Sequence, residues 1–380
     1  MKRLMVISIL FLLAPYSLAL SPTHLWSYTD ECAVFSLSIN DEGYISLAFG
    51  YYAELLSPNG TLLMKAPTRG IAYSTALSDN NVVLIGTEGN WVQAFSSSGK
   101  LLWEYRTADN VVSVAVSKDG RWAAAGDASG YTYFFKDGKL SWKKKVGDYV
   151  WKVSIKNDTV LAGSTGRIVA FQTSGSERWT LEVTGDVRDV IPTNRGVGIL
   201  IVPKSENWAT VELIGPNKNV LWSVNFSRYV RKIESDGENI AVAGMTGKVV
   251  LISINSGRVV YSSPLAMYAN DVGTLGGYTI VSGGRIAQLI APNGSVVWFK
   301  KFNGTVYHVA FSPKGYFLTE YGSHDVQNCY SNITAWSLSG KTYQRRHLKE
   351  GGSITFNIYT GVILIAIIAF LGVLLWKRGQ

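Results

Sequence analysis

The fold is decided by the stretch NVVSVAVSKDGRWAAAGDASGYTYFFKDGKLSWKKKVGD, residues Asn110 to Asp148. Its apolar runs and turns predict four short strands, which are a valine-rich run up to Asp119-Gly120, Trp122 to Ala125, Tyr131 to Phe135, and a run after Asp137-Gly138 that carries Trp142. A unit of about 40 residues with strands and a turn glycine at the reversals is typical of one blade of a β-propeller.

The same unit recurs along nearly the whole chain. Its clearest marker is a large side chain four residues after the last turn, and the marker positions are Met64, Trp103, Trp142, Trp179, Trp222, Tyr261, Trp298 and, less regularly, Gln344. Successive markers are 37 to 46 residues apart. This period predicts an all-β, eight-bladed propeller of four-stranded antiparallel blades. Seven blades remain possible, because the unit from Val187 to Ser227 is interrupted by Pro192, Pro203 and Lys218.

The two ends of the repeat array predict how the ring closes. The segment His24 to Tyr28 resembles the tail of a unit, with Trp26 in the place of Trp103, whereas Gln344 breaks the pattern of the last unit. We therefore expect the N-terminal segment to supply the outer strand of the last blade. Such pairing removes the exposed edge that an open array would leave.

Both termini carry membrane signals. Lys2-Arg3, an apolar run to Leu13 and small residues up to Ala19 predict a secretory signal over residues 1–19, with a retained N-terminal anchor as the alternative. An uncharged run over residues 358–376, followed by Lys377-Arg378, predicts a C-terminal transmembrane helix with the tail 377–380 in the cytoplasm. The expected domains are then a propeller ectodomain over 20–344, extracellular on a single-pass cell-membrane protein, and a stalk over 345–357.

Residues suited to an exported protein support this localisation. Six Asn-x-Ser/Thr triplets are candidate glycan acceptors, at Asn59, Asn157, Asn225, Asn293, Asn303 and Asn332. The chain has two cysteines, Cys32 and Cys329. In the proposed ring they lie on connections that emerge on the same face of neighbouring blades, which predicts a disulfide between the two ends of the ring.

Aligning the first strand of each unit reveals two candidate functional columns. One column is Ser36, Ser74, Ser113, Lys152, Asp189, Lys232, Asp271 and His308, and the preceding column is Phe35, Tyr73, Val112, Trp151, Arg188, Arg231, Asn270 and Tyr307. First strands are innermost in a propeller, so we expect one column to face the axial channel or its mouth.

Two interpretations of these columns stay open. The charges alternate in sign from blade to blade, so they could neutralise one another around a polar channel. Alternatively, the channel mouth is a ligand site lined by Trp151, Lys152, Arg188, Asp189, Arg231, Lys232, Asn270, Asp271, Tyr307 and His308. Acidic groups converging on His308 would favour an enzyme over a binding module.

The repeats resemble a known family. The segments VQAFSSSGKLLW (Val92–Trp103), IVAFQTSGSERW (Ile168–Trp179) and VVLISINSGRVVY (Val249–Tyr261) look like the repeat of the quinoprotein-type, PQQ-like and WD40-like propellers. This resemblance implies a propeller in which a strand Trp docks between blades. Quinone-dependent members use adjacent cysteines and a calcium site, which this chain lacks, so we expect no PQQ, no metal and no catalytic residues.

The net charge and its distribution indicate which classes of partner to expect. The net charge of +9 comes from Lys and Arg spread over turns and outer strands, as in Lys143-Lys144-Lys145, and nucleic acid is not an expected partner of an exported body. The combination of propeller, glycan triplets and short tail resembles archaeal cell-surface proteins. We therefore predict a membrane-anchored binding or scaffold module for an envelope protein or glycan. The alternative is a divergent PQQ-like oxidoreductase, another enzyme or a ligand sensor that uses the channel mouth. No feature predicts an oligomeric state.

Overall fold

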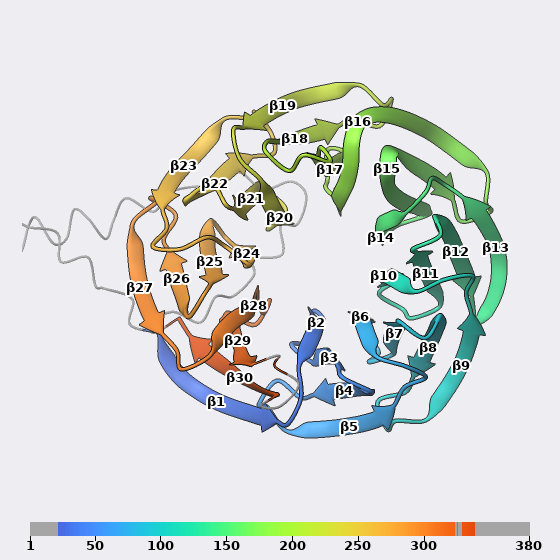
Figure 1. Cartoon of the computed structure of the whole chain (residues 1–380), viewed down its shortest axis with the longest axis horizontal. Coiled ribbons are helices and arrows are strands. Elements are labelled where there is room, and N and C mark those ends of the chain that lie inside the picture. Colours follow the sequence, from blue (N-terminus) through green and yellow to red (C-terminus); the bar gives the residue numbers. More distant parts are fainter. Residues whose placement is uncertain (1–21, 324, 326–328, 339–380) are drawn as a thin grey trace, which may run out of the picture. The chain divides into compact units, whose positions relative to one another are not determined.

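The computed structural model describes residues 22–323, 325 and 329–338, which belong to one compact unit. The predicted signal, stalk, membrane helix and tail lie outside these residues. Within the described ranges no helix is long and apolar enough to cross a membrane. The unit is all-β, and its strands are arranged as a ring of sheets with the first strand of each repeat innermost (Figure 1).

The strands pair antiparallel throughout the described part of the chain. The first three sheets are formed, from the inner to the outer strand, by β2 (Val34–Ile39), β3 (Ile45–Phe49), β4 (Tyr52–Leu56) and β5 (Leu62–Pro67); by β6 (Ala72–Leu77), β7 (Val83–Thr87), β8 (Trp91–Phe95) and β9 (Leu101–Arg106); and by β10 (Val111–Val116), β11 (Trp122–Asp127), β12 (Tyr131–Lys136) and β13 (Lys139–Lys145).

The next sheet has six strands, and three further sheets have four each. The six are β14 (Val150–Lys156), β15 (Thr159–Gln172), β16 (Glu177–Pro192), β17 (Val197–Val202), β18 (Ala209–Ile214) and β19 (Val220–Phe226). The fifth sheet is formed by β20 (Val230–Ser235), β21 (Asn239–Gly244), β22 (Lys248–Ser253) and β23 (Val259–Pro264). The sixth is formed by β24 (Asp271–Leu275), β25 (Tyr278–Gly283), β26 (Ile286–Ile290) and β27 (Val296–Lys301). The last is formed by β28 (Thr305–Phe311), β29 (Tyr316–Ser323) and β30 (Tyr330–Ser337), with β1 (Thr23–Asp30) outermost.

The count of separate sheets is therefore seven, and eight separate blades are not supported. Seven is the alternative that the irregular unit from Val187 to Ser227 had left open, and that unit lies in the six-stranded sheet. The sheet is continuous because β15 and β16 each pair with one neighbour through their first half and with the other through their second half.

The hydrophobic core lies between adjacent sheets. The second and third strands are apolar on both faces, as in β3 and β7, where every residue is buried. Outer strands alternate, and β5 buries only Met64 and Ala66 of its six residues. One core cluster joins Leu55 and Met64 of the first sheet to Ile85 of the second. Each sheet is thus covered on both faces by its neighbours in the ring.

The marker side chains of the outer strands dock on the turn of the next repeat. The Trp103 ring lies so close to Gly138 that a Cβ there would come within 2.7 Å of it, and Trp142 covers Gly175 in the same way at 2.9 Å. Gly138 also has a φ of +77°, which L side chains rarely adopt. The indole Nε1 of Trp142 donates a hydrogen bond to the carbonyl of Thr173 at 3.1 Å. At these turns docking therefore needs both the large side chain and the turn glycine, whereas Lys218 takes the corresponding turn position, with a φ of +56°, in the repeat after Trp179.

The ring is closed by β1, which pairs with β30 from Thr23↔Ser337 to Asp30↔Ser331. The docking interaction continues across this junction, because Trp26 of β1 covers Gly60 and donates its indole N–H to the Pro58 carbonyl at 2.9 Å. N-terminal β1 thus completes the sheet of β28–β30 and also holds the first sheet.

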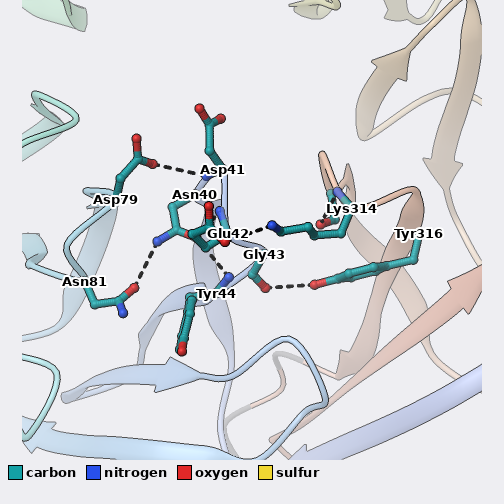
Figure 2. A network of polar contacts seen from close by, with 10 residues as sticks. Asn40, Asp41, Glu42, Gly43, Tyr44, Asp79, Asn81, Lys314 and Tyr316 are labelled. Atoms are coloured by element: carbon teal, nitrogen blue, oxygen red, sulfur yellow. Dashed lines mark hydrogen bonds and ion pairs between the residues drawn. The ribbon is translucent and has the colours of Figure 1, made fainter. Parts of the chain in front are cut away.

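Polar turns interlock at the end of the ring where the inner strands finish (Figure 2). The turn after β2 lies between the turns of its two neighbours. On one side Asn40 Nδ2 donates to the Asn81 side chain at 2.9 Å. On the other side the Tyr316 hydroxyl donates to the Gly43 carbonyl at 2.8 Å, and Lys314 pairs with Glu42 at 2.8 Å. We call this the base end of the ring, and the opposite end the mouth.

Docking by the marker tryptophans predicts a clear stability difference. Trp142 is 9% exposed and also packs on Phe134 and Phe171. We expect Trp142→Ala to lower the free energy of unfolding by about 3–5 kcal/mol, seen as a lower urea midpoint. Phe299→Ala, at a side chain 51% exposed on an outer strand, should cost less than about 1 kcal/mol. Equal losses in the two variants would contradict the docking role.

Candidate binding site at the mouth of the ring

The column that runs from Phe35 to Tyr307, which we call the mouth column, sits on a repeated backbone irregularity. In seven inner strands the register with the next strand shifts by one residue, at Phe35, Tyr73, Val112, Trp151, Arg188, Arg231 and Tyr307. Asn270 directly precedes β24, where no shift occurs. A β-bulge inserts an unpaired residue and re-aims its side chain. The sequence revealed the column, but it contained no signal for the bulges that expose it.

The other column, which runs from Ser36 to His308, connects inner strands of neighbouring sheets. The Ser36 hydroxyl accepts the Thr75 N–H at 3.3 Å, and the Ser113 hydroxyl accepts the Val153 N–H at 3.2 Å. The carboxylates of Asp189 and Asp271 accept the N–H groups of Ile233 and Val309 at 3.4 and 3.2 Å. These side chains therefore hold neighbouring sheets together around the channel.

The charges of this column neutralise one another. Lys152 Nζ lies 3.8 Å from Asp189 Oδ1, and Lys232 Nζ lies 2.5 Å from Asp271 Oδ1. Burial is the largest influence on Asp271 and raises its pKa, but Lys232 and His308 together outweigh it and lower the pKa to about 2. The same contact raises the pKa of Lys232 against the effect of burial. Both groups therefore remain charged at neutral pH.

Two acidic groups converge on His308. Asp271 Oδ2 lies 3.5 Å from His308 Nδ1, and Glu320 is the register partner of His308 on β29. His308 Nε2 lies 3.2 Å from the carbonyl oxygen of Val34. Both ring nitrogens thus lie next to oxygen acceptors of the protein. Burial is the largest effect and lowers the pKa of His308, but Asp271 and Glu320 raise it overall.

Glu320 itself is fully buried and was not singled out by the sequence. Within the described residues neither of its carboxyl oxygens has a hydrogen-bond partner. Burial, chiefly, raises its pKa to about 7. A second buried carboxyl, Glu54, accepts a hydrogen bond from the Tyr28 hydroxyl at 3.0 Å and pairs with Lys65 at 3.0 Å, and burial raises its pKa to about 7. Both carboxyls lie where the two ends of the ring meet.

Aromatic side chains of the mouth column form an arc. Phe35 and Tyr73, on adjacent inner strands, stack with ring centroids 6.3 Å apart. Trp151 packs against Tyr149 at 4.2 Å, and the Arg188 guanidinium lies 3.7 Å from the centre of the Trp151 ring. Burial, followed by the neighbouring Tyr73 hydroxyl, raises the pKa of Tyr149. Tyr149, which precedes its strand, thus extends the aromatic surface beside Trp151, and the column alignment missed it.

A long connection supports one end of this arc. The connection 203–208 between β17 and β18 brings Glu206 to within 3.1 Å of Arg188 NH2, and Asp186 also lies 3.1 Å from that nitrogen. Glu206 adopts a φ of +52°, which is uncommon for a residue other than glycine. Arg188 is thus fixed over Trp151 by two carboxylates. Neither acid was predicted from the sequence.

The remaining predicted site residues are placed as follows. The Cys32 and Cys329 thiols are not bonded, but their side chains interact with each other. Five glycan-acceptor candidates are exposed, and Asn332 is half-buried on β30. His24 lies on β1 and His308 on β28, the two edge strands of the same sheet. His324 and His347 fall outside the described residues. The described residues contain no group of three or more His, Cys, Asp or Glu side chains arranged to hold a metal ion.

Comparison with known proteins identifies the family. The family described as outer membrane protein assembly factor BamB matches residues 55–195 and, in a second overlapping match, 136–274. The chain belongs to this PQQ-like propeller family. No curated protein matches it. The docking Trp–Gly contacts described above agree with a repeat of this family.

Solved structures agree on the fold. BamB from Moraxella catarrhalis is 13% identical with a TM-score of 0.65, covering 83% of this chain and all of that one. The computationally designed Ika8 protein is 13% identical with a TM-score of 0.68, covering 83% and 99% of the two chains. Saccharomyces cerevisiae Sqt1 is 11% identical with a TM-score of 0.69, covering 82% and 98%. At these identities the similarity establishes the PQQ-like propeller architecture alone.

The buried Glu320 predicts a pH-dependent stability. Its pKa of about 7 in the fold exceeds the ordinary 4.5, so the folded chain holds a proton that the unfolded chain releases first. Stability is therefore lost as the pH rises from about 4.5 to about 7, by up to about 3 kcal/mol for this group. Glu320→Gln keeps the side chain neutral at every pH. The free energy of unfolding of this variant, relative to that of the wild type, should therefore be higher at pH 8 than at pH 5. A difference that does not change with pH, measured by urea unfolding, would exclude this role.

Proposed function

We propose that this PQQ-like propeller is a cell-surface, membrane-anchored binding module that presents its mouth to an envelope protein or glycan. The observation that carries the proposal is the arrangement of strand ends. Thr23 and Ser337 pair at the base end, opposite the mouth where Val34 begins the first inner strand. The predicted membrane run 358–376 follows Ser337 in the sequence. An anchor attached at the base would leave the mouth available to a partner.

Binding is favoured over catalysis by the chemistry of the mouth. The only acids that converge on His308 are engaged with Lys232 and with backbone N–H groups, or are fully buried, among the residues that the structure describes. Both nitrogens of His308 already lie next to oxygen acceptors of the protein, one beside Asp271 and the other beside the Val34 carbonyl. The aromatic arc, by contrast, is partly exposed, with Phe35 at 38% and Tyr73 at 41%. Aromatic and arginine side chains of this kind dominate the energetics of protein interfaces.

The proposal is tested in native membranes. The tagged full chain is cross-linked mildly, purified in detergent, and its partners and cross-linked residues are identified by mass spectrometry. We expect a reproducible envelope partner or glycan, with cross-links on the connections at the mouth. A control variant with base-end substitutions Glu42→Lys and Lys314→Glu, which exchange an exposed ion pair, should recover the same partner. Cross-links confined to the base end would disprove the proposal.

We also propose that Cys32 and Cys329 form a disulfide in the exported protein. Cys32 lies between β1 and β2, Cys329 directly precedes β30, and the two side chains already interact. A dithiol–disulfide oxidoreductase of the exporting compartment would accept the two electrons and two protons that the thiols lose. The bond would join the two ends of the ring across about 300 residues of sequence.

The disulfide has a direct mass-spectrometric test. The wild-type protein should be lighter by two hydrogen atoms than after reduction, and a Cys32–Cys329 linked peptide should appear in the non-reduced digest. Cys32→Ser should lower the free energy of unfolding by about 2–5 kcal/mol under oxidising conditions and much less after reduction. Free thiols in protein isolated without reductant would contradict the proposal.

Finally, we infer that the ring contains eight repeat units, two of which share the six-stranded sheet. The support is a second repeated bulge, at the start of the outer strand and just before the docking side chain. It occurs eight times in the described chain, before Trp26, Met64, Trp103, Trp142, Trp179, Trp222, Tyr261 and Trp298. An experimental structure with seven docking positions would refute this count.

A further inference from the structure

The aromatic arc at the mouth consists of Phe35, Tyr73, Tyr149 and Trp151, with Arg188 lying over Trp151. Its rings come from four connections or strands of three sheets, so no local packing requirement brings them together. The bulges of β2, β6 and β14 leave Phe35, Tyr73 and Trp151 outside the strand pairing. Phe35 and Tyr73 remain about two-fifths exposed, at 38% and 41%. The arc is therefore an aromatic surface held on rigid strands.

The cations closest to the arc are already engaged, whereas Arg231 on the neighbouring β20 is exposed. Arg188 is held by Asp186 and Glu206, Lys152 pairs with Asp189, and Lys232 pairs with Asp271. Each cation of these pairs has an acidic partner within 4 Å, so the charges near the arc largely cancel. A carbohydrate site needs carboxylates or amides that are available to bind hydroxyl groups, and an anionic ligand needs an unpaired cation. The arc itself, with its neighbouring cations paired, complements an uncharged apolar ligand better than either.

The ligand class that fits this surface is part of a protein. Tyr, Trp and Arg supply large contact areas at a low cost in conformational entropy and are enriched at binding hot spots. The rings come from β2, β6, β14 and the connection before β14, so they span several inner strands and match an extended chain better than one small ring. We propose that the mouth binds an extended, uncharged segment of a partner protein that carries aromatic or aliphatic side chains, chiefly through Tyr73 and Trp151.

This inference rests on the proposed binding function and specifies its partner. Stacking and burial would supply the affinity, so binding should depend little on ionic strength. Charge-mediated binding weakens strongly when salt screens it. The segments of this chain that lie outside the described residues are the competing occupants. The first and last strands of the described chain meet at the base end, at Thr23 and Ser337.

The test uses the full chain in mild detergent and a phage-displayed library of random linear dodecapeptides. Selected sequences are synthesised with a fluorescent label, and Kd is measured by anisotropy. We expect enrichment of uncharged peptides with two or more aromatic or aliphatic residues. Raising NaCl from about 0.05 M to about 0.5 M should change Kd less than about twofold.

Variants locate the site. Tyr73→Ala and Trp151→Ala should each weaken peptide binding about tenfold or more, while Trp151→Phe should retain most of the affinity. Phe299→Ala is the matched control, because Phe299 is a comparably exposed ring on an outer strand, and it should leave Kd unchanged. Circular dichroism and urea midpoints establish that each variant is folded. Two independent arc substitutions keep the test valid if one of them does not fold.

Four results would overturn the inference. The first three are that no peptide is enriched, that both arc variants bind the peptides as tightly as the wild type does, and that salt abolishes binding. The fourth is that the protein binds an oligosaccharide array and that the arc variants lose this binding. Cross-linking of residues 339–380 to the arc, with peptides unable to compete, would instead make the chain's own C-terminal segment the occupant. If peptide binding fails while native cross-linking still recovers a partner on the other mouth connections, the proposed function stands and only this inference falls.

Discussion

The structure depends on one repeated contact, in which an outer-strand tryptophan docks on the turn glycine of the next repeat. Trp103 on Gly138 and Trp142 on Gly175 show why it is exacting. The turn must lack a Cβ to let the indole approach, and Gly138 must also adopt a positive φ. The contact connects neighbours alone, so it makes the ring a sum of similar interfaces. It also needs a closing strand, and β1 carries Trp26 into the same contact with Gly60.

Docking at the rim leaves the centre of the ring to polar chemistry. The inner strands cannot interdigitate as closely as the middle strands, and their side chains border the channel. Serines and aspartates there accept backbone N–H groups of the next inner strand, as Asp271 does for Val309. Lysines then neutralise the aspartates. This arrangement uses the channel charges for the stability of the ring, so the exposed aromatic rings at the mouth become the better candidates for recognition.

The junction of the two chain ends concentrates the unusual groups of the molecule. Cys32 and Cys329, the buried carboxyls Glu54 and Glu320, and His308 all lie at or beside it. No chain connection joins β1 to β30 within the closing sheet, whereas the connection after β1 leads directly to β2 of the first sheet. The β1–β30 pairing is therefore the place where opening would begin. Stability there depends on strand pairing and on the protonation of the buried carboxyls Glu54 and Glu320.

The sequence by itself determined the all-β class, the repeat period, the docking residues and the two aligned columns of the inner strands, because alternation and turn glycines are local signals. It also indicated that β1 belongs with the last repeat, through Trp26. Tertiary structure decided what local signals cannot encode. It merged two repeats into one sheet, placed Phe35 and Trp151 on bulges, brought Tyr149 to the arc, and buried Glu320 beside His308. Each of these depends on groups far apart in sequence, whose distance is set only when the ring closes.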